Sequence, residues 1–329
     1  MLEIDGSHRS GSGSIVRLAT AYAAMTGTAV RVVNARARRP KPGLRRQHVT
    51  AVEAVRGLVG GELEGVAVNS KEFVFRPGDA TPAGEYRWDI GSAGSTTALT
   101  LALLPVLACR GGGARIEVRG GLFQDFAPSV FHLQEVVAPL LGRMGFAVEF
   151  TVVRPGYVPA GEGILRVTVP PATEVQPLVV VDRGGLRRVW GISLASHLDD
   201  RRVASRMVDA AREVLASDGV TATIEERSDD TSVQPGAAFA LFAEFDGGVR
   251  LGADGAGARG RPAEEIGRRV ARSLLKLIGS GASVDRFTAD QLIVFTTLAN
   301  GRSVFRSPEV TEHVESAAWL ASLFLGVEV

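Results

Sequence analysis

A repeated pattern most limits how this 329-residue chain can fold: a turn rich in glycine and serine, an apolar helix, a glycine and then a strand. Residues 11–14 form the first such turn and predict a helix over 15–25 and a strand over 29–34. A second copy follows residues 91–95, with a helix that ends near Cys109 and a strand over 115–119. Repetition of this kind indicates stacked α/β modules rather than one doubly wound sheet.

A third, weaker copy predicts a helix over 282–300 and a strand from Ser303. Further helices are predicted after the three copies, over 44–58, 129–143 and 312–325. The spacing before the third copy is longer than the first by about the size of a small domain. We therefore predict a main domain over 1–183 and 281–329, with a smaller α/β domain over 184–280 inserted in the third module. The expected elements of that insert are a strand, a helix, two strands and a helix, over 189–195, 202–216, 220–226, 237–245 and 263–277.

Composition excludes several classes of protein. The net charge of +1 provides no global attraction to polyanions, so any such site must come from local clustering. One cysteine, Cys109, excludes a disulfide framework and a cysteine-rich zinc site and favours a reducing, cytoplasmic location. Residues 1–5 lack the features of a secretory signal, and the apolar run over 98–109 is too short to span a bilayer.

A basic segment follows the first predicted strand. Arginines and one lysine are interleaved with prolines, which predicts a stiff, extended conformation. The segment runs into a helix start, whose free N–H groups attract phosphate. A solvated surface and a phosphate-binding site both remain open interpretations. The basic residues are Arg36, Arg38, Arg39, Lys41, Arg45 and Arg46.

The two glycine/serine turns and the histidines are less specific. Each turn lies at a helix N-terminus, where it can cradle phosphate or serve only as a cap, and neither has the Walker A pattern. The histidines have no helical metal-ligand spacing. They are His8, His48, His132, His197 and His313. The residues alone thus predict an α/β protein with a phosphate-binding surface and specify no reaction.

Four sequence blocks resemble the RNA 3'-terminal phosphate cyclase family. Residues 36–51 read RARRPKPGLRRQHVTA, close to the family's RxGRPKPGLxxQHLTA, with Arg38 in place of a glycine. Residues 73–78 (FVFRPG), 89–96 (DIGSAGST) and 289–292 (ADQL) match further family blocks in the same order. The resemblance covers nearly the whole chain and implies three βαβαββ-type modules with a domain inserted in the third.

The resemblance also implies a reaction with ATP and RNA ends that carry a 3'-phosphate. In that reaction a histidine is adenylylated, AMP passes to the RNA 3'-phosphate, and the 2'-hydroxyl closes a 2',3'-cyclic phosphodiester, with Mg²⁺ or Mn²⁺ as the expected divalent metal. His313 matches the family's histidine. The expected adenylate contacts are Phe287, Asp290, Gln291 and Pro128, and the expected phosphate or RNA-end contacts are Arg17, Arg36, Arg39, Gln47 and His48.

Some positions depart from the family pattern. Ser10 and Ser14 stand where the family has Glu and Gln, residues 122–126 replace a Thr-Asp-Asn-Pro-Met run, and Ser316-Ala317 replaces Thr-Asn. Because the lost Glu is associated with metal and ATP in the family, an RNA-binding scaffold without catalysis is the alternative. An enolpyruvyl-transferase-like enzyme is a second alternative, disfavoured by the block over 36–51 and by the inserted domain.

Overall fold

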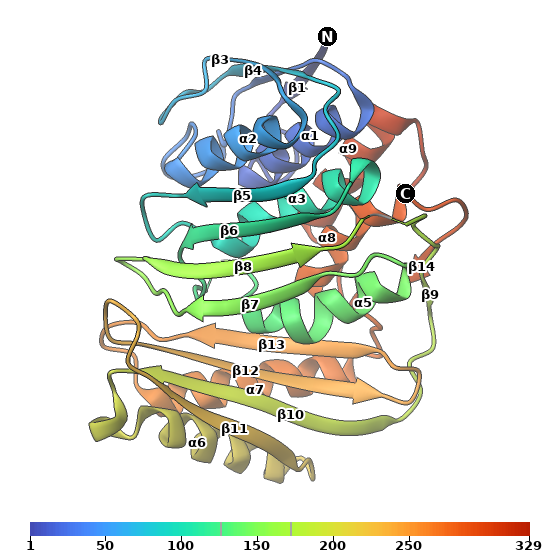
Figure 1. Ribbon diagram of the computed structural model, residues 1–329. Helices are drawn as coiled ribbons and strands as arrows, with labels where there is room; N and C mark the ends of the chain where they lie inside the picture. Colours follow the sequence, from blue (N-terminus) through green and yellow to red (C-terminus); the bar gives the residue numbers. More distant parts are fainter. Residues whose placement is uncertain (126, 172) are drawn as a thin grey trace.

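The computed structural model describes residues 1–125, 127–171 and 173–329, and has the predicted α/β class. Figure 1 shows three four-stranded sheets in succession, with the N-terminal sheet at one end, the inserted sheet at the other and helices packed along them. None of the helices in these ranges combines the length and apolar character needed to cross a bilayer.

The first sheet has the strand order β1-β2-β4-β3, with β1 parallel to β2 and the other pairs antiparallel. Its helix α1 starts after Ser12, whose side chain accepts a hydrogen bond from the Ser14 N–H, and ends at Gly27 in the left-handed conformation. The elements are β1 (Leu2–Asp5), α1 (Gly13–Thr26), β2 (Val30–Val33), α2 (Arg46–Val59), β3 (Gly61–Glu64) and β4 (Phe73–Pro77).

The second sheet, β5-β6-β8-β7, repeats both the order and the strand directions of the first. Ser95 caps the almost entirely buried helix α3, and the helix predicted over 129–143 contains a π-helical turn at Leu133–Val137. The elements are β5 (Gly84–Asp89), α3 (Thr96–Arg110), β6 (Ala114–Gly120), α4 (Val130–His132), α5 (Ala138–Arg143), β7 (Glu149–Arg154) and β8 (Gly163–Val169).

The third group of elements is smaller. Its strands β9 (Val179–Val180) and β14 (Val304–Phe305) form a short parallel pair. Helices α8 (Arg286–Thr296) and α9 (Glu312–Leu325) pack against each other, and also against α3 and α1 respectively. The prediction of three repeated modules stays a prediction, because among the described residues this group has a two-stranded pair where the first two groups have four-stranded sheets.

The inserted segment forms its own sheet, β11-β10-β12-β13, covered on one face by α6 and α7. Strand β13 contacts α4 and the π-helical turn of the second group. The sequence did not reveal β13, because glycines interrupt its apolar alternation. The predicted domain boundaries stay a prediction. The elements are β10 (Leu186–Ser196), the short 3-10 helix η2 (Asp199–Arg201), α6 (Val203–Ser217), β11 (Ala222–Asp229), β12 (Gly236–Phe245), β13 (Arg250–Ala256) and α7 (Ala263–Gly279).

Candidate active site

A cavity of about 580 Å³ lies where the first residues of α1, α2, α3, α8 and α9 meet. Free N–H groups and the positive ends of helix dipoles at these termini favour a bound anion. All ten residues predicted for the site line this cavity, namely Arg17, Arg36, Arg39, Gln47, His48, Pro128, Phe287, Asp290, Gln291 and His313. The cavity is also lined by residues that were not predicted as site residues, including Ser95, Ala98, Leu101, Gln124, Asp125, Arg286 and Thr311.

His313 is the second residue of α9, directly after the capping region of that helix. Its Nδ1 atom is 3.1 Å from Ser14 Oγ and 4.0 Å from the nearest carboxylate oxygen of Asp290. Burial lowers the pKa of His313, and the positive charges of Arg17 and Arg39 lower it further. The imidazole is therefore neutral near pH 7 and retains a lone pair for nucleophilic attack.

Arg17 and Asp290 both line the cavity, and the charge of each affects the pKa of the other. Burial lowers the pKa of Arg17 to about 10, against the opposing effect of Asp290, so Arg17 is still a cation near pH 7. Burial raises the pKa of Asp290 to about 7, and hydrogen bonding with Gln291 and the charge of Arg17 offset this only in part. The cavity therefore presents a fixed positive charge beside a carboxyl group that titrates near neutrality.

The basic segment is folded into turns, which corrects the extended conformation expected from its prolines. Arg36 has a φ of +58°, and its Nη1 donates hydrogen bonds to Lys41 O at 2.9 Å and Gly43 O at 2.6 Å. These two hydrogen bonds hold the segment in turns. They outweigh the preference of the prolines for an extended backbone. Arg39 is exposed, and its side chain makes no hydrogen bond or ion pair with the described residues.

Gln47 and His48 build the wall between α1, α2 and α3. Gln47 Oε1 accepts a hydrogen bond from the Ser95 N–H at 2.9 Å, which joins α2 to the cap of α3. His48 is 2% exposed, and its Nδ1 accepts from the Arg45 N–H at 3.1 Å. Burial lowers the pKa of His48 well below its ordinary value, aided by Arg17 and Arg36, so its ring is neutral.

Arg38, which stands in place of the family's glycine, contacts the loop before α1 and the start of α9. Its Nη1 donates to Arg9 O and lies 3.3 Å from a carboxylate oxygen of Glu312. Its side chain also packs against Gly11, where an added Cβ would be only 2.4 Å from Arg38 Cγ. Arg38 thereby connects the basic segment to the residue that precedes His313.

The expected nucleotide side lies at the first turns of α8. Asp285 caps this helix by accepting hydrogen bonds from the N–H groups of Phe287 and Thr288, both at 3.0 Å. Its other carboxylate oxygen lies 3.3 Å from Nε2 of the buried His132. A buried contact between His132 and Asp285 therefore fixes the start of the helix that carries Phe287, Asp290 and Gln291. Pro128 lines the same cavity, and its carbonyl accepts from Thr97 Oγ1 at 2.8 Å.

Asp125 connects the cavity to the inserted segment, and no sequence motif indicated it. Its carboxylate is 2.8 Å from Arg261 Nη2 and 3.1 Å from Arg269 Nη2. It belongs to residues 122–126, where the chain departs from the family. Leu122 and Phe123 are each 1% exposed, so they have become core residues. Phe126, the last of the run, lies outside the described residues.

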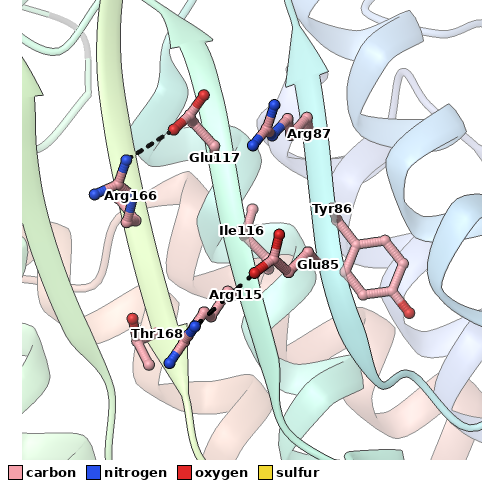
Figure 2. A pocket seen from close by; sticks show the side chains of 8 residues that line it. All are labelled: Glu85, Tyr86, Arg87, Arg115, Ile116, Glu117, Arg166 and Thr168. Carbon is pink, nitrogen blue, oxygen red and sulfur yellow. Dashed lines mark hydrogen bonds and ion pairs between the residues drawn. The ribbon is translucent and has the colours of Figure 1, made fainter.

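A second concavity, of about 310 Å³, lies on the outer face of the second sheet (Figure 2). Its charges pair across the strands: Arg115 with Glu85 at 3.9 Å, and Arg166 with Glu117 at 3.1 Å. Charged groups that satisfy one another on an open sheet are typical of a solvated surface. The ten predicted site residues line the cavity of about 580 Å³ and not this concavity.

The family resemblance implies a divalent metal, but the described residues offer no evident set of ligands for one. Within the described ranges, no group of three or more His, Cys, Asp or Glu side chains is placed to hold a metal ion. Of the two carboxyl groups in the cavity lining, Asp125 is paired with arginines and Asp290 has a raised pKa. A nucleotide fits the arginines, helix N-termini and aromatic ring of this cavity, whereas a protein-held metal does not, and we derive no step through one.

Comparison with known proteins places this geometry in a family. The profile of the RNA 3'-terminal phosphate cyclase family matches residues 8–329. The RNA 3'-terminal phosphate cyclase of Methanopyrus kandleri is 39% identical, over all of this chain and 94% of the relative. The proteins of the same name from Caldivirga maquilingensis and Nitrosospira multiformis are 36% and 38% identical, over 100% and 99% of this chain and 94% and 92% of the relatives. This chain belongs to the RNA 3'-terminal phosphate cyclase family, whose members are enzymes of the ligase class.

Proposed function

We propose that this protein converts an RNA 3'-terminal phosphate to a 2',3'-cyclic phosphodiester, with ATP, through a covalent His313–AMP intermediate. The observation that carries the proposal is the placement of His313. A histidine with a lowered pKa lies in one cavity with Arg17 and Arg39 and with five helix N-termini, in a chain of this family. The parts required to bind a triphosphate and attack it are thus in one place.

In the first step, a lone pair of the neutral imidazole attacks the α-phosphorus of ATP. The new P–N bond forms as the bond to the β-phosphate oxygen breaks, and pyrophosphate leaves with the electron pair. Arg17 and Arg39 would stabilise the charge that develops on the phosphate oxygens, because both are cationic near pH 7 and line the cavity. Arg36 contributes its charge while its Nη1 holds the basic segment closed.

The start of α8 would hold the nucleoside. Phe287 offers an aromatic face for the adenine, Pro128 offers an apolar wall, and Asp290 and Gln291 provide polar contacts. Ala98 and Leu101 add apolar lining to the cavity.

In the remaining steps, the RNA 3'-phosphate attacks the adenylate and takes AMP from His313, and the neighbouring 2'-hydroxyl then displaces AMP to close the ring. Gln47 and His48 would shape the binding site for the RNA end, since the hydrogen bond from Ser95 to Gln47 holds α2 beside α3 and the one from Arg45 to His48 caps α2. We expect Mg²⁺ or Mn²⁺ to accompany the triphosphate rather than to occupy a site made by the protein. We infer a cytoplasmic location from the single cysteine.

Incubation with α-labelled ATP and a divalent metal, followed by denaturing electrophoresis, tests the first step. We expect acid-labile label on the wild-type protein and none on His313→Ala. The matched control is His197→Ala, because His197 lies in the inserted segment and bonds to Ser232 O. A cyclisation assay with RNA that ends in a 3'-phosphate then tests the remaining steps. Absence of label with either metal would contradict the proposal and favour the RNA-binding scaffold.

A further inference from the structure

One wall of the cavity is a short stretch of chain between β6 and α4. Gln124, Asp125, Ala127 and Pro128 all line the cavity there, and we call these four residues the wall segment. Pro128 is the residue that the proposed function places against one face of the adenine. The position of the wall segment therefore affects how closely the cavity can enclose a base.

The peptide group that follows Pro128 is held from both sides. Its carbonyl oxygen accepts a hydrogen bond from Thr97 Oγ1 at 2.8 Å, in α3. Its N–H, which belongs to Ser129, donates to Asp254 Oδ2 at 2.7 Å, in strand β13 of the inserted segment. Because a trans peptide group is planar, with its C=O and N–H directed to opposite sides, the two bonds fix the orientation of that plane. Pro128 is attached to the plane at its Cα atom, so the inserted segment takes part in orienting its ring.

Asp125 anchors the other end of the wall segment to the inserted segment. Its two carboxylate oxygens accept from Arg261 Nη1 at 3.1 Å and Nη2 at 2.8 Å. Arg269 Nη2 donates at 3.1 Å and the Ala256 N–H at 3.4 Å. Burial tends to raise the pKa of Asp125, but the bonds to the two arginines outweigh it and lower that pKa. Asp125 is therefore an ionised group held by three residues of the inserted segment.

These contacts are partly shielded from water. Ser129 is 5% exposed, and the side chains of Asp125 and Arg261 are each 23% exposed. Two parallel bonds between a guanidinium and a carboxylate also fix geometry more strictly than a single contact does. More exposed ion pairs contribute little, as expected for Arg206 with Glu264 on the surface of the inserted segment. The anchors of the wall segment are thus of the kind that can constrain a loop.

Strand β13 also contacts the opposite side of the nucleotide pocket. It is an edge strand of the inserted sheet and lies next to the second group of elements (Figure 1). A Cβ atom on Gly252 would be 2.7 Å from His132 Nδ1, so the strand approaches this ring closely. His132 Nε2 in turn lies 3.3 Å from Asp285, the cap of the helix that carries Phe287. One strand of the inserted segment is therefore connected to both sides of the pocket.

We propose that the inserted segment is the positioning element of the nucleotide pocket, in which Asp254 and Arg261 hold the wall segment in the conformation that binds the base. This inference rests on the proposed function, which places the adenine beside Pro128. Asp254 and Arg261 are positioning residues, because neither is among the residues that line the cavity. Asp125 belongs to residues 122–126, where the chain departs from the family, so the family pattern does not imply this anchor.

The proposal predicts a selective defect when an anchor is lost. A wall segment without its anchors samples other conformations, and the apparent Kd rises in inverse proportion to the fraction that remains competent to bind. The base depends on the wall segment, whereas the phosphates depend on Arg17 and Arg39 at the other linings of the cavity. Loss of an anchor should therefore weaken the binding of ATP and spare the binding of a phosphate chain that has no base.

Equilibrium dialysis with ATP and, separately, with inorganic tripolyphosphate tests this selectivity. Arg261→Ala and Asp254→Ala should each raise the Kd for ATP about tenfold and leave the Kd for tripolyphosphate unchanged. Arg261→Lys should recover only part of the affinity, because an ammonium group cannot make the two parallel bonds. Asp254→Asn should recover most of it, because Asn keeps an acceptor oxygen for the Ser129 N–H. That variant also removes the charge of Asp254 near His132, so its recovery separates the hydrogen bond from the charge.

Two control variants lie in the same inserted segment. Arg206→Ala breaks the same kind of two-bond pair, with Glu264, between α6 and α7. Asp209→Ala removes an exposed carboxylate from α6. We expect neither control to change either Kd. In an Asp125→Ala background, Arg261→Ala should have no further effect, because its partner in the wall segment is already absent.

Amide hydrogen exchange at Ser129 measures the anchoring without any ligand. We expect exchange about tenfold faster in Arg261→Ala and Asp254→Ala than in the wild type, and no change in the two controls. Arg261 does not contact Ser129, so faster exchange in Arg261→Ala would report a loosened wall segment rather than the loss of one bond.

Adenylylation separates positioning from chemistry. The KM for ATP should rise about tenfold in both anchor variants, while label transfer at saturating ATP stays within about twofold of the wild type. Unchanged ATP affinity in both variants, or an equal loss of affinity for tripolyphosphate, overturns the proposal. A wild type that binds ATP but takes no label would reject the proposed chemistry and leave this inference standing. If the wild type binds no ATP, the proposed function and the role in nucleotide binding both fail, and exchange at Ser129 reports the anchoring alone.

Discussion

The imidazole of His48 lies directly against Gly13, so that a Cβ atom on Gly13 would be only 2.1 Å from His48 Nε2. Gly13 is the first residue of α1, and His48 lies in the first turn of α2. This contact lets the N-termini of the two helices approach each other at the cavity. A glycine is required there by the close approach of a buried ring.

We expect Gly13→Ala to destabilise the protein by about 1–3 kcal/mol, because the new methyl group must displace a packed side chain. Urea denaturation measures the change in the free energy of unfolding. Gly142→Ala is the control, since Gly142 lies in α5 and an added Cβ meets nothing within 4 Å. That variant should gain up to about 1 kcal/mol from helix propensity. Equal stability of Gly13→Ala and the wild type would show that His48 moves freely.

Asp290 should make stability depend on pH between about 4 and 7. Burial raises its pKa from 3.8 to about 7, so the folded state binds more protons than the unfolded state in this window. The free energy of unfolding contributed by Asp290 therefore falls as pH rises through the window and levels off above it. Asp290→Asn removes this contribution and should become more stable than the wild type by up to roughly 4 kcal/mol above pH 7.

Urea denaturation of the wild type and Asp290→Asn at a series of pH values measures that difference. The exposed Asp218 provides the control substitution, Asp218→Asn. A difference between Asp290→Asn and the wild type that does not grow with pH would contradict a raised pKa at Asp290.

Asp285→Ala should destabilise the protein by about 3–5 kcal/mol, because it breaks a buried pair and removes the cap of α8. Burial opposes a charged His132, but the nearby Asp285 outweighs it and raises the pKa of His132. The variant leaves that histidine without its carboxylate partner. Affinity for ATP should also fall, because Phe287 donates its N–H to Asp285.

Urea denaturation and equilibrium dialysis with ATP measure the two effects of Asp285→Ala. Asp182→Ala is the control, because Asp182 accepts a hydrogen bond from the Gly184 N–H on the surface. We expect that change to cost less than about 1 kcal/mol. Unaltered ATP affinity in Asp285→Ala would show that the cap of α8 does not contribute to nucleotide binding.

Arg39→Ala should lower the rate of adenylylation by about tenfold to a hundredfold while stability stays within about 0.5 kcal/mol of the wild type. The physical reason is the exposed guanidinium in the cavity lining, which makes no hydrogen bond or ion pair to the described residues. Label transfer from α-labelled ATP measures the rate, and Arg212→Ala in α6 controls for the loss of one exposed arginine. Full activity in a well-folded Arg39→Ala protein would show that Arg39 has no role in adenylylation.

Much of the local structure could be predicted from sequence, because caps and apolar periodicity act within one helix. The helix predicted over 312–325 is confirmed as Glu312–Leu325, and the one predicted over 15–25 as Gly13–Thr26. Strands were harder to predict from sequence, and β13 was missed because glycines interrupt its apolar alternation. The predicted helix over 282–300 is shorter in the structure, Arg286–Thr296, because Asp285 caps it after an irregular start.

The sequence by itself determined the α/β class, the family and ten of the residues that line the cavity, since these follow from periodicity and from family motifs that can be read along the chain. Only the tertiary structure decided how those residues meet. Ser14 and His313 are 299 residues apart in sequence, and Arg38 reaches Glu312 across 274. Such contacts depend on how helices pack against one another, and no local pattern encodes that arrangement. The turns of the basic segment were decided in the same way, because hydrogen bonds from a single arginine outweighed the preference of its prolines.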